Sequence, residues 1–162
     1  MSTKFFTNST GNTLFDKFKG IAADMINFDS FLAVVGFFRS SGYFKLRKEL
    51  GNVSEIKILV GINIDDIFRK HNKALLMLAD EDKAKEIYHN GFKEDIINAQ
   101  YSPEVEEGIL QMCEDLVSGR LQMRIHATRN LHAKFYLCLP QNHSEHSDGW
   151  VIMGSSNISD SG

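Results

Sequence analysis

The sequence predicts an α/β domain in which a mixed β-sheet is flanked by helices. Short apolar runs typical of strands alternate along the chain with segments whose apolar residues recur at helical spacing. The 162 residues fit one domain, 1–162, with 43% apolar and 24% charged residues, the balance of an ordinary globular protein. No internal repeat or low-complexity tract divides the sequence.

The N-terminal segment predicts a helix followed by a strand. Asn12 or Thr13 has a side chain that can cap the start of a helix. The apolar residues that follow at helical spacing are Leu14, Phe15, Phe18, Ile21, Ala22 and Met25. An apolar run over 30–38 then predicts the first strand of the sheet.

The next segments predict a helix, a second strand and a helical insertion. A short helix is expected to begin at Ser40 or Ser41 and to end near Leu50, before a strand over 55–62. Both strands are near-continuous apolar runs bounded by glycine, which predicts a sheet covered on both faces. Residues about 63–100 combine many charges with apolar residues at helical spacing, so they predict a helical insertion packed on the sheet.

Residues 102–126 predict a well-marked helix and a short strand. Pro103 suits the first helical turn after Ser102, and Gly119 suits the helix end. The apolar residues expected to face the core are Val105, Ile109, Met112 and Leu116. The segment Leu121–His126 alternates apolar and polar residues, the pattern of a strand with one buried face.

The last two apolar runs predict a pair of adjacent strands. Residues 131–139 alternate, so that His132 and Lys134 point to one face and the apolar residues to the other. The segment 140–149 is polar and turn-rich, and it separates this run from the short apolar run 150–153. The two runs therefore predict neighbouring strands joined by a long surface loop.

Groups that can bind a phosphate gather at the ends of these two strands. His132 offers an imidazole nucleophile and Lys134 an ammonium on the same face. Gly154 lets the backbone approach a phosphate closely, while Ser155 and Asn157 can donate hydrogen bonds to its oxygens. Either group alone is ordinary structural chemistry. Their conjunction on consecutive predicted strands indicates a site for phosphodiester chemistry.

This combination resembles half of an active site of the phospholipase D-like superfamily. The residues that match the family signature, His-x-Lys followed by Gly-Ser and a nearby asparagine, are His132, Lys134, Gly154, Ser155 and Asn157. Leu139 stands where the family usually has an aspartate, and the spacing from the lysine to the glycine is longer than in the common pattern. Nuclease-like members often lack that aspartate, so the departure favours the nuclease and restriction-endonuclease branch.

The resemblance implies a metal-independent phosphodiesterase that acts through a covalent phosphohistidine. His132 would attack phosphorus, and Lys134 and Asn157 would hold the nonbridging oxygens. The loop residues implied to bind the phosphate are Gly154, Ser155 and Ser156. No cofactor and no metal are implied. A second histidine must protonate the leaving oxygen, and it comes either from a homodimer that places His132 of each subunit at one site or from a second motif in a longer chain.

The resemblance also implies a phospholipase D-like mixed sheet that is truncated at its C-terminal end. The runs 31–38 and 55–62 resemble the first core strands of such domains at the N-terminus of helicase-type proteins or in restriction endonucleases. Family members continue beyond the Gly-Ser-Asn loop with a helix and a further strand, whereas this sequence stops at Gly162. We therefore expect an N-terminal fragment of a larger DNA-processing or restriction/helicase-type protein, with helicase or other domains linked on its C-terminal side.

The charge of the chain favours a local nucleic-acid interface. A net charge of -3 does not by itself indicate nucleic-acid binding, which relies on lysine and arginine against phosphates. Arg120, Arg124 and Arg129 are nonetheless close in sequence to Lys134, although the first two are explained equally well as solvated residues. Arg129, in the loop before His132, is the expected substrate contact. The expected partner is nucleic acid, with DNA ahead of RNA.

Other functions fit parts of the sequence. A catalytically inactive domain would bind nucleic acid as a targeting module of a larger helicase, and it would tolerate His132→Ala. A metal-dependent hydrolase would use a ligand set from His143, Glu145 and His146 with His126 or Asp148. That cluster ranks low because its loop lacks the fixed helix on which such metal-ligand spacing depends. A lipid substrate is the remaining alternative, and no amphipathic segment favours it.

Nothing in the sequence indicates a membrane or a disulfide-stabilised secreted protein. No run is long and uncharged enough to span a bilayer, and the N-terminus lacks a basic region followed by an apolar core. Cys113 and Cys138 suggest no disulfide framework. The sequence therefore predicts a cytoplasmic protein with no membrane partner.

Overall fold

The computed structural model describes Phe5, Thr7 and the ranges 10–25, 27–51, 53–61, 102–126 and 131–158. Three sequence predictions lie outside the described residues: the helical insertion of about 63–100, the strand residue Ile62 and the substrate contact Arg129.

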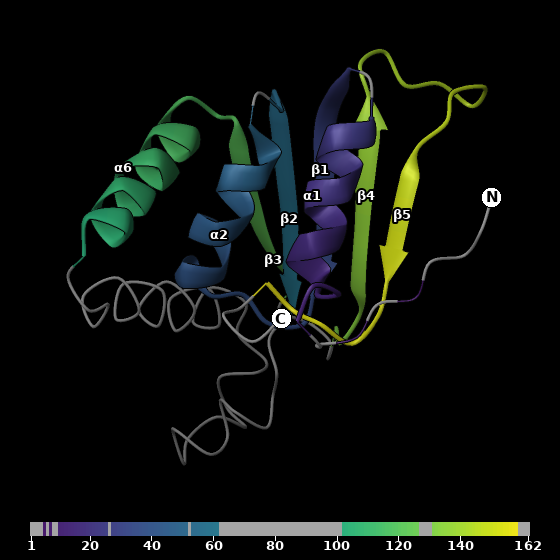
Figure 1. The fold of residues 1–162 in the computed structure, drawn as a ribbon. Coiled ribbons are helices and arrows are strands. Elements are labelled where there is room, and N and C mark those ends of the chain that lie inside the picture. The colour runs from purple at the N-terminus through teal and green to yellow at the C-terminus, as the bar shows by residue number, and fades with distance from the viewer. Residues whose placement is uncertain are drawn as a thin grey trace.

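In the described part of the chain, the first six elements alternate between helix and strand, and two more strands follow (Figure 1). In chain order they are α1 (Leu14–Asp24), β1 (Phe28–Val35), α2 (Ser40–Leu50), β2 (Glu55–Gly61), α6 (Pro103–Val117), β3 (Leu121–His126), β4 (Lys134–Pro140) and β5 (Trp150–Met153). The strands form one five-stranded mixed sheet in the order β3-β2-β1-β4-β5. The predicted α/β class is therefore confirmed.

The strand directions bring several strand ends to one edge of the sheet. β1, β2 and β3 run parallel, whereas β4 is antiparallel to β1, and β5 is antiparallel to β4, as predicted for the last two strands. The register places Val35, at the end of β1, beside both Val60 and Lys134. The carboxyl ends of β1, β2, β3 and β5 therefore meet the amino end of β4 at the lower edge in Figure 1, which we call the carboxyl edge.

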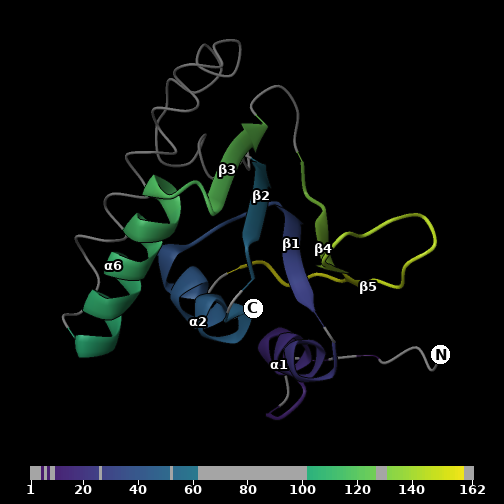
Figure 2. The ribbon, with the colours of Figure 1, turned by 90° about the horizontal axis from the view of Figure 1, so that it is seen from above.

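The three described helices lie on one face of the sheet, as Figure 2 shows. Phe18 of α1 packs edge-to-face against Phe31 and Tyr136, with ring centroids 5.3 Å apart in both pairs. The opposite face carries half-buried residues such as Leu32 and Val34. The sequence predicted cover on both faces, whereas the described helices cover one, and burial alternates along β1 as a result.

The predicted helix ends are confirmed. The Thr13 hydroxyl accepts a hydrogen bond from the Asp16 N–H at 3.2 Å, and the Asp16 carboxylate accepts one from the Thr13 N–H at 2.8 Å, a reciprocal cap at the start of α1. The Ser102 side chain caps α6, and Pro103 occupies its first turn. Gly119 follows α6 with a φ of 77°, the left-handed conformation that glycine adopts readily.

The buried side of α6 differs from the prediction at one position. Met112 is buried, and Val105 and Ile109 are half-buried against the core, as expected. Leu116 was predicted to face the core, but its side chain is 40% exposed. Asp115 takes the inward position instead and is only 4% exposed. A buried carboxylate is retained where several donors satisfy it.

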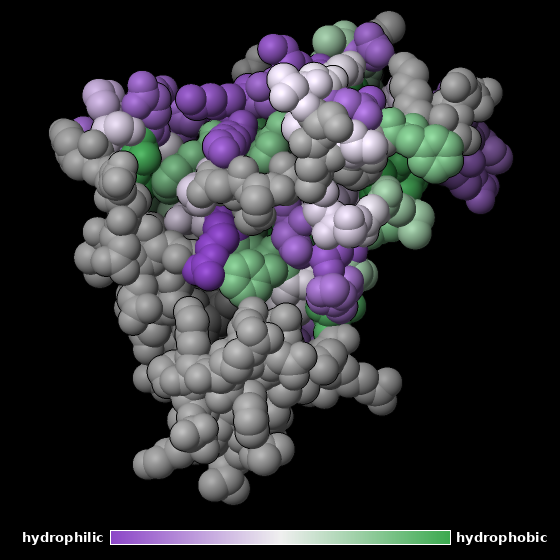
Figure 3. Space-filling view, turned by 60° about the horizontal axis from the view of Figure 1, so that its bottom comes forward, coloured by the Kyte–Doolittle hydropathy of each residue, from purple (hydrophilic) through white to green (hydrophobic). Residues whose placement is uncertain are grey.

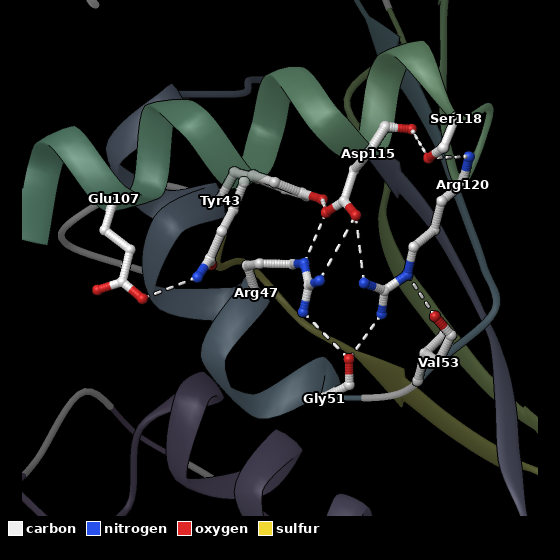
Figure 4. Close-up of polar contacts among 9 residues, drawn as sticks. Tyr43, Arg47, Gly51, Val53, Glu107, Asp115, Ser118 and Arg120 are labelled. Atoms are coloured by element: carbon white, nitrogen blue, oxygen red, sulfur yellow. Dashed lines mark hydrogen bonds and ion pairs between the residues drawn. The ribbon is translucent and has the colours of Figure 1, made fainter.

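Asp115 is satisfied by a hydroxyl and two guanidinium groups (Figure 4). The Tyr43 hydroxyl donates to Asp115 Oδ2 at 2.7 Å, and Arg47 Nε donates to the same oxygen at 2.6 Å. Arg120 Nη1 donates to Asp115 Oδ1 at 3.2 Å. Burial alone raises the pKa of the Asp115 carboxyl, but the hydrogen bonds and the two positive charges outweigh it and hold the pKa below its ordinary value.

Arg120 therefore serves the scaffold. Its closeness to Lys134 in the sequence left open a role near the phosphate-binding residues, and the structure places it elsewhere. Arg120 precedes β3, and its guanidinium also donates to the carbonyls of Gly51 and Val53, which precede β2. These residues lie at the amino ends of the parallel strands, opposite the carboxyl edge. Arg124 lies exposed in the middle of β3.

Two strands have bounds that differ from the prediction. β1 spans Phe28–Val35 rather than 30–38, and Phe38 instead forms an isolated parallel bridge with Ile158. β4 begins at Lys134 rather than at 131. Residues 131–133 leave the strand because the chain there packs across the carboxyl ends of two neighbouring strands.

No helix among the described residues is long and apolar enough to cross a membrane. Figure 3 turns the carboxyl edge toward the viewer, and in the part not drawn in grey hydrophilic and hydrophobic residues are interspersed.

Candidate functional site

His132 and Lys134 are in direct contact at the carboxyl edge. Lys134 Nζ lies 2.8 Å from His132 Nε2 and donates a second hydrogen bond to the His132 carbonyl at 3.1 Å. Because an ammonium group only donates hydrogen bonds, His132 Nε2 is the acceptor, and the neutral imidazole carries its proton on Nδ1. The contact therefore presents the nucleophilic form of the ring, with its outer lone pair held by Lys134.

Lys134 is buried, with only 7% of its surface exposed, although it carries an ammonium group. Burial lowers the pKa of that group from its ordinary value. Among the residues that the structure describes, no carboxylate forms an ion pair with Lys134. A buried positive charge without a counter-charge costs free energy, and an arriving anion would remove that cost. The surroundings of Lys134 therefore favour an anionic ligand.

The Gly-Ser-Ser-Asn loop, residues 154–157, is tied to two different strands. The Gly154 N–H donates to the Lys134 carbonyl at 3.3 Å. The Tyr136 hydroxyl donates to the Ser156 carbonyl at 2.6 Å, and burial raises the pKa of that hydroxyl, so that it stays protonated. Asn157 Oδ1 accepts a hydrogen bond from the Phe37 N–H at 3.0 Å, just beyond the end of β1. These three contacts fix the loop beside the start of β4.

The residues of this loop differ in accessibility. Gly154 and Ser155 are exposed, and Asn157 is half-buried. Ser156 is buried, with 8% of its surface exposed. The Ser155 hydroxyl is therefore better placed to reach a ligand than the Ser156 hydroxyl, whose residue lies against the core.

Three residues that the sequence reasoning did not single out belong to this edge. Gly36 follows β1 and packs against His132, and Gly61 ends β2 and packs against Leu131. Arg39 adds a cation, because its guanidinium carbon lies 4.5 Å from the centroid of the Phe37 ring. The two glycines carried a signal in the sequence, since each directly follows an apolar strand run.

His126 ends β3 at the same edge, opposite Gly61. Its Nδ1 is buried and has no hydrogen-bond partner among the described residues. The sequence reasoning used this imidazole only in the metal-site alternative.

The loop histidines do not assemble the ligand set of that alternative. His143 Nδ1 lies 3.1 Å from the Ser147 hydroxyl, and His146 lies 3.4 Å from Glu145 with both side chains exposed. In the described part of the chain, no three His, Cys, Asp or Glu side chains come together in a group that could hold a metal ion. The predicted cluster of His143, Glu145 and His146 with His126 or Asp148 is therefore not formed.

The chemistry of the carboxyl edge follows from these contacts. A neutral imidazole and a buried ammonium touch each other, and the nearby loop supplies an exposed hydroxyl and an anchored carboxamide. An imidazole can attack phosphorus or carbon, and the three donors can stabilise a developing oxyanion. The arrangement is suited to a substrate with a tetrahedral anionic centre.

Comparison with known proteins identifies no family. No family model matches the chain, and no curated protein matches it.

Proposed function

We propose that this domain is a metal-independent phosphodiesterase of the phospholipase D-like kind, and that it cleaves DNA through a covalent phosphohistidine on His132. The observation that carries the proposal is the buried Lys134 ammonium, 2.8 Å from His132 Nε2 and without a carboxylate partner among the described residues. An anionic substrate would balance the charge of the Lys134 ammonium, and the His132 imidazole would lie beside it as a nucleophile. The match of the His-x-Lys and Gly-Ser-Ser-Asn residues to the family signature supports the reaction type.

The proposed reaction begins when a phosphate diester enters the site. Lys134 transfers its hydrogen bond from His132 Nε2 to a nonbridging oxygen, and the lone pair on Nε2 becomes free to attack phosphorus in line. A bond forms between Nε2 and phosphorus, and the bond to the leaving oxygen breaks as that oxygen takes a proton. Ser155 and the carboxamide nitrogen of Asn157 donate to the oxygens where charge accumulates. Water then loses a proton to the imidazole that protonated the leaving oxygen and attacks phosphorus, and the bond between phosphorus and Nε2 breaks to release His132.

A second imidazole completes the proposed reaction, because the leaving oxygen must be protonated. In a homodimer with its two-fold axis through the site, each subunit would supply His132 to the other. The other source is a second motif in a longer chain. In either arrangement the domain would serve a larger DNA-processing protein of the restriction or helicase type, and Arg129 would contact the nucleic acid.

The test is cleavage of end-labelled DNA by the protein in excess EDTA. We expect cleavage that persists in EDTA and is lost in His132→Ala, because no metal takes part and the nucleophile is gone. His146→Ala is the matched control, since that imidazole is exposed in the loop before β5. Quenching with alkaline detergent during turnover, which preserves the acid-labile bond between histidine and phosphorus, should trap labelled DNA on the wild-type chain and not on His132→Ala. Cleavage unchanged by His132→Ala, or abolished by EDTA, would contradict the proposal.

A catalytically inactive DNA-binding module is the second candidate function. It is favoured by the hydrogen bond from Lys134, which occupies the lone pair that would have to attack. This alternative predicts DNA binding that is equal in the wild type and in His132→Ala, with no phosphate trapped on the chain. Equilibrium binding measured beside the trapping experiment separates the two functions.

A further inference from the structure

The carboxyl ends of β1 and β2 carry glycines where the chain before β4 crosses them. A Cβ atom built on Gly36 would lie 3.1 Å from His132 Cδ2 and 3.3 Å from the Leu131 carbonyl oxygen. A Cβ atom built on Gly61 would lie 2.1 Å from that same oxygen and 2.9 Å from Leu131 Cβ. Any larger residue at either position would displace residues 131–132. We call these two glycines the glycine platform.

The same strand end also holds Asn157. The Phe37 N–H donates to Asn157 Oδ1 at 3.0 Å, and the Arg39 N–H donates to the Ile158 carbonyl at 2.9 Å. With Oδ1 bound to the backbone, the Nδ2 end of the carboxamide is the end that can donate to a ligand. The backbone of residues 37–39 therefore sets both the place and the orientation of Asn157.

The two halves of the site are thus positioned by two adjacent residues that directly follow β1. Gly36 contacts the His132 ring, and Phe37, the next residue, holds the Asn157 side chain. Consecutive Cα atoms are separated by a fixed ~3.8 Å across a trans peptide. β1 is the central strand of the sheet and is hydrogen-bonded to a neighbour on each side. The backbone of Gly36 and Phe37, which directly follows it, is therefore held in place.

We propose that Gly36, Gly61 and the Phe37 amide are the positioning residues of the site, and that they fix the His132 imidazole relative to the Asn157 carboxamide. None of the three acts on the substrate. This inference rests on the proposed function and deepens it by naming what sets the attack geometry. A displacement of about 1 Å at a reacting group can cost about 10²-fold in rate, and a methyl group on Gly36 would displace the imidazole directly.

Gly36→Ala is the principal test, because its contact with His132 calls for a small movement rather than a backbone rearrangement. With bis(p-nitrophenyl) phosphate as substrate, we expect kcat to fall by about 3- to 10-fold, less than the about 10²-fold that a displacement of about 1 Å can cost, and KM to change much less. Gly20→Ala is the matched control, because a Cβ atom there would meet nothing within 4 Å. A platform that served chain packing alone would lower stability and leave kcat of the folded enzyme unchanged, and that result would overturn the proposal.

Two further measurements complement the kinetic test. The first does not depend on catalysis, and the second does not depend on the folding of Gly36→Ala. The first is the NMR chemical shift of the His132 ring protons, which should change in Gly36→Ala and not in Gly20→Ala. The second is hydrogen exchange of the Phe37 amide, which should become faster in Asn157→Ala because its acceptor is removed. If the wild type proves not to cleave phosphodiesters, the proposed function fails while these readouts still test the positioning. An unchanged His132 ring, or an unchanged Phe37 amide, would overturn the positioning itself.

Discussion

Lys134 combines three properties at the scale of single residues. It is buried, it lies against His132, and no carboxylate among the described residues balances its charge. The arginines of the scaffold differ from Lys134 in having a carboxylate partner, because Arg47 and Arg120 both form an ion pair with Asp115. A buried charge without an ion-pair partner contributes little to stability. Proteins retain such groups mainly at functional sites.

Lys134→Met tests this reading by removing the charge while keeping an unbranched side chain. We expect cleavage to fall by about 10²- to 10³-fold, the usual effect of removing one oxyanion donor. Stability near neutral pH should be equal to or higher than that of the wild type, because the buried ammonium is gone. Cleavage assays and urea unfolding measure the two effects.

The pH dependence of Lys134→Met follows from the lowered pKa of Lys134. In the window below the ordinary value of 10.5 and above the folded-state pKa, the unfolded chain binds more protons than the folded chain. Across that window, the free energy of unfolding of the wild type should therefore rise with pH relative to that of Lys134→Met. Lys57→Met is the control, because Lys57 is 45% exposed and pairs with Glu55. A Lys134→Met variant that cleaves normally would contradict the role given to the ammonium.

At the scale of elements, α2 and α6 approach closely at a glycine. A Cβ atom built on Gly108 of α6 would lie 2.5 Å from Phe44 Cγ and 2.9 Å from Phe44 Cβ of α2. These atoms lie near the Phe44 backbone, so the ring cannot simply swing away. The helix–helix contact therefore depends on the missing side chain, whereas Gly20 of α1 has open space around it.

Gly108→Ala and Gly20→Ala should have opposite effects on the free energy of unfolding. Gly20→Ala should raise it by about 0.5–1 kcal/mol, because alanine loses less backbone entropy in a helix. Gly108→Ala gains the same preference but forces the two helices apart, and overpacking costs about 1–3 kcal/mol. Urea denaturation of both variants measures the difference. A stabilised Gly108→Ala would show that α6 does not pack on α2 at this distance.

At the scale of the whole molecule, two polar clusters lie at opposite edges of the sheet. The Asp115 cluster, made by Asp115 with Tyr43, Arg47 and Arg120, joins α2, α6 and the start of β3 (Figure 4). In this cluster each oxygen of the Asp115 carboxylate pairs with a guanidinium group. At the carboxyl edge, His132 lies against Lys134, which forms no ion pair with any carboxylate of the described residues. The first cluster stabilises the scaffold on which the second is held.

Asp115→Asn should destabilise the protein by about 2–4 kcal/mol, somewhat less than breaking a fully buried ion pair, because it leaves two half-buried arginines without their carboxylate. The lowered pKa of Asp115 makes this effect depend on pH. A carboxyl whose folded-state pKa is depressed contributes stability that is present above its unfolded value, 3.8, and is lost as the pH falls through the folded-state pKa.

The difference in unfolding free energy between wild type and Asp115→Asn should therefore be full at neutral pH and should narrow below pH 3.8. Urea unfolding across this range is the measurement, and Glu114→Gln, at the exposed neighbouring position, is the control. A difference that stays constant down to the lowest pH would show that the charge of Asp115 is not what holds the cluster.

Local pattern in the sequence was enough to predict most of the described elements. Helical spacing and capping residues predicted α1 and α6. Alternation predicted β3, and a short apolar run predicted β5, both at their observed bounds. The alternation of His132 and Lys134 also predicted that the two side chains share a side, and they are in contact. These predictions succeed because periodicity and caps are properties of neighbouring residues.

What the sequence by itself determined is the α/β class, the order of these elements and the types of group available for phosphate chemistry. Only the tertiary structure decided that Lys134 is buried, that Asp115 rather than Leu116 faces the core, and that Arg120 belongs to the scaffold. It also decided that the chain before β4 crosses the glycine platform instead of continuing as a strand. The physical reason is that burial and close approach arise between residues far apart in the chain, and no local pattern records which segments will meet.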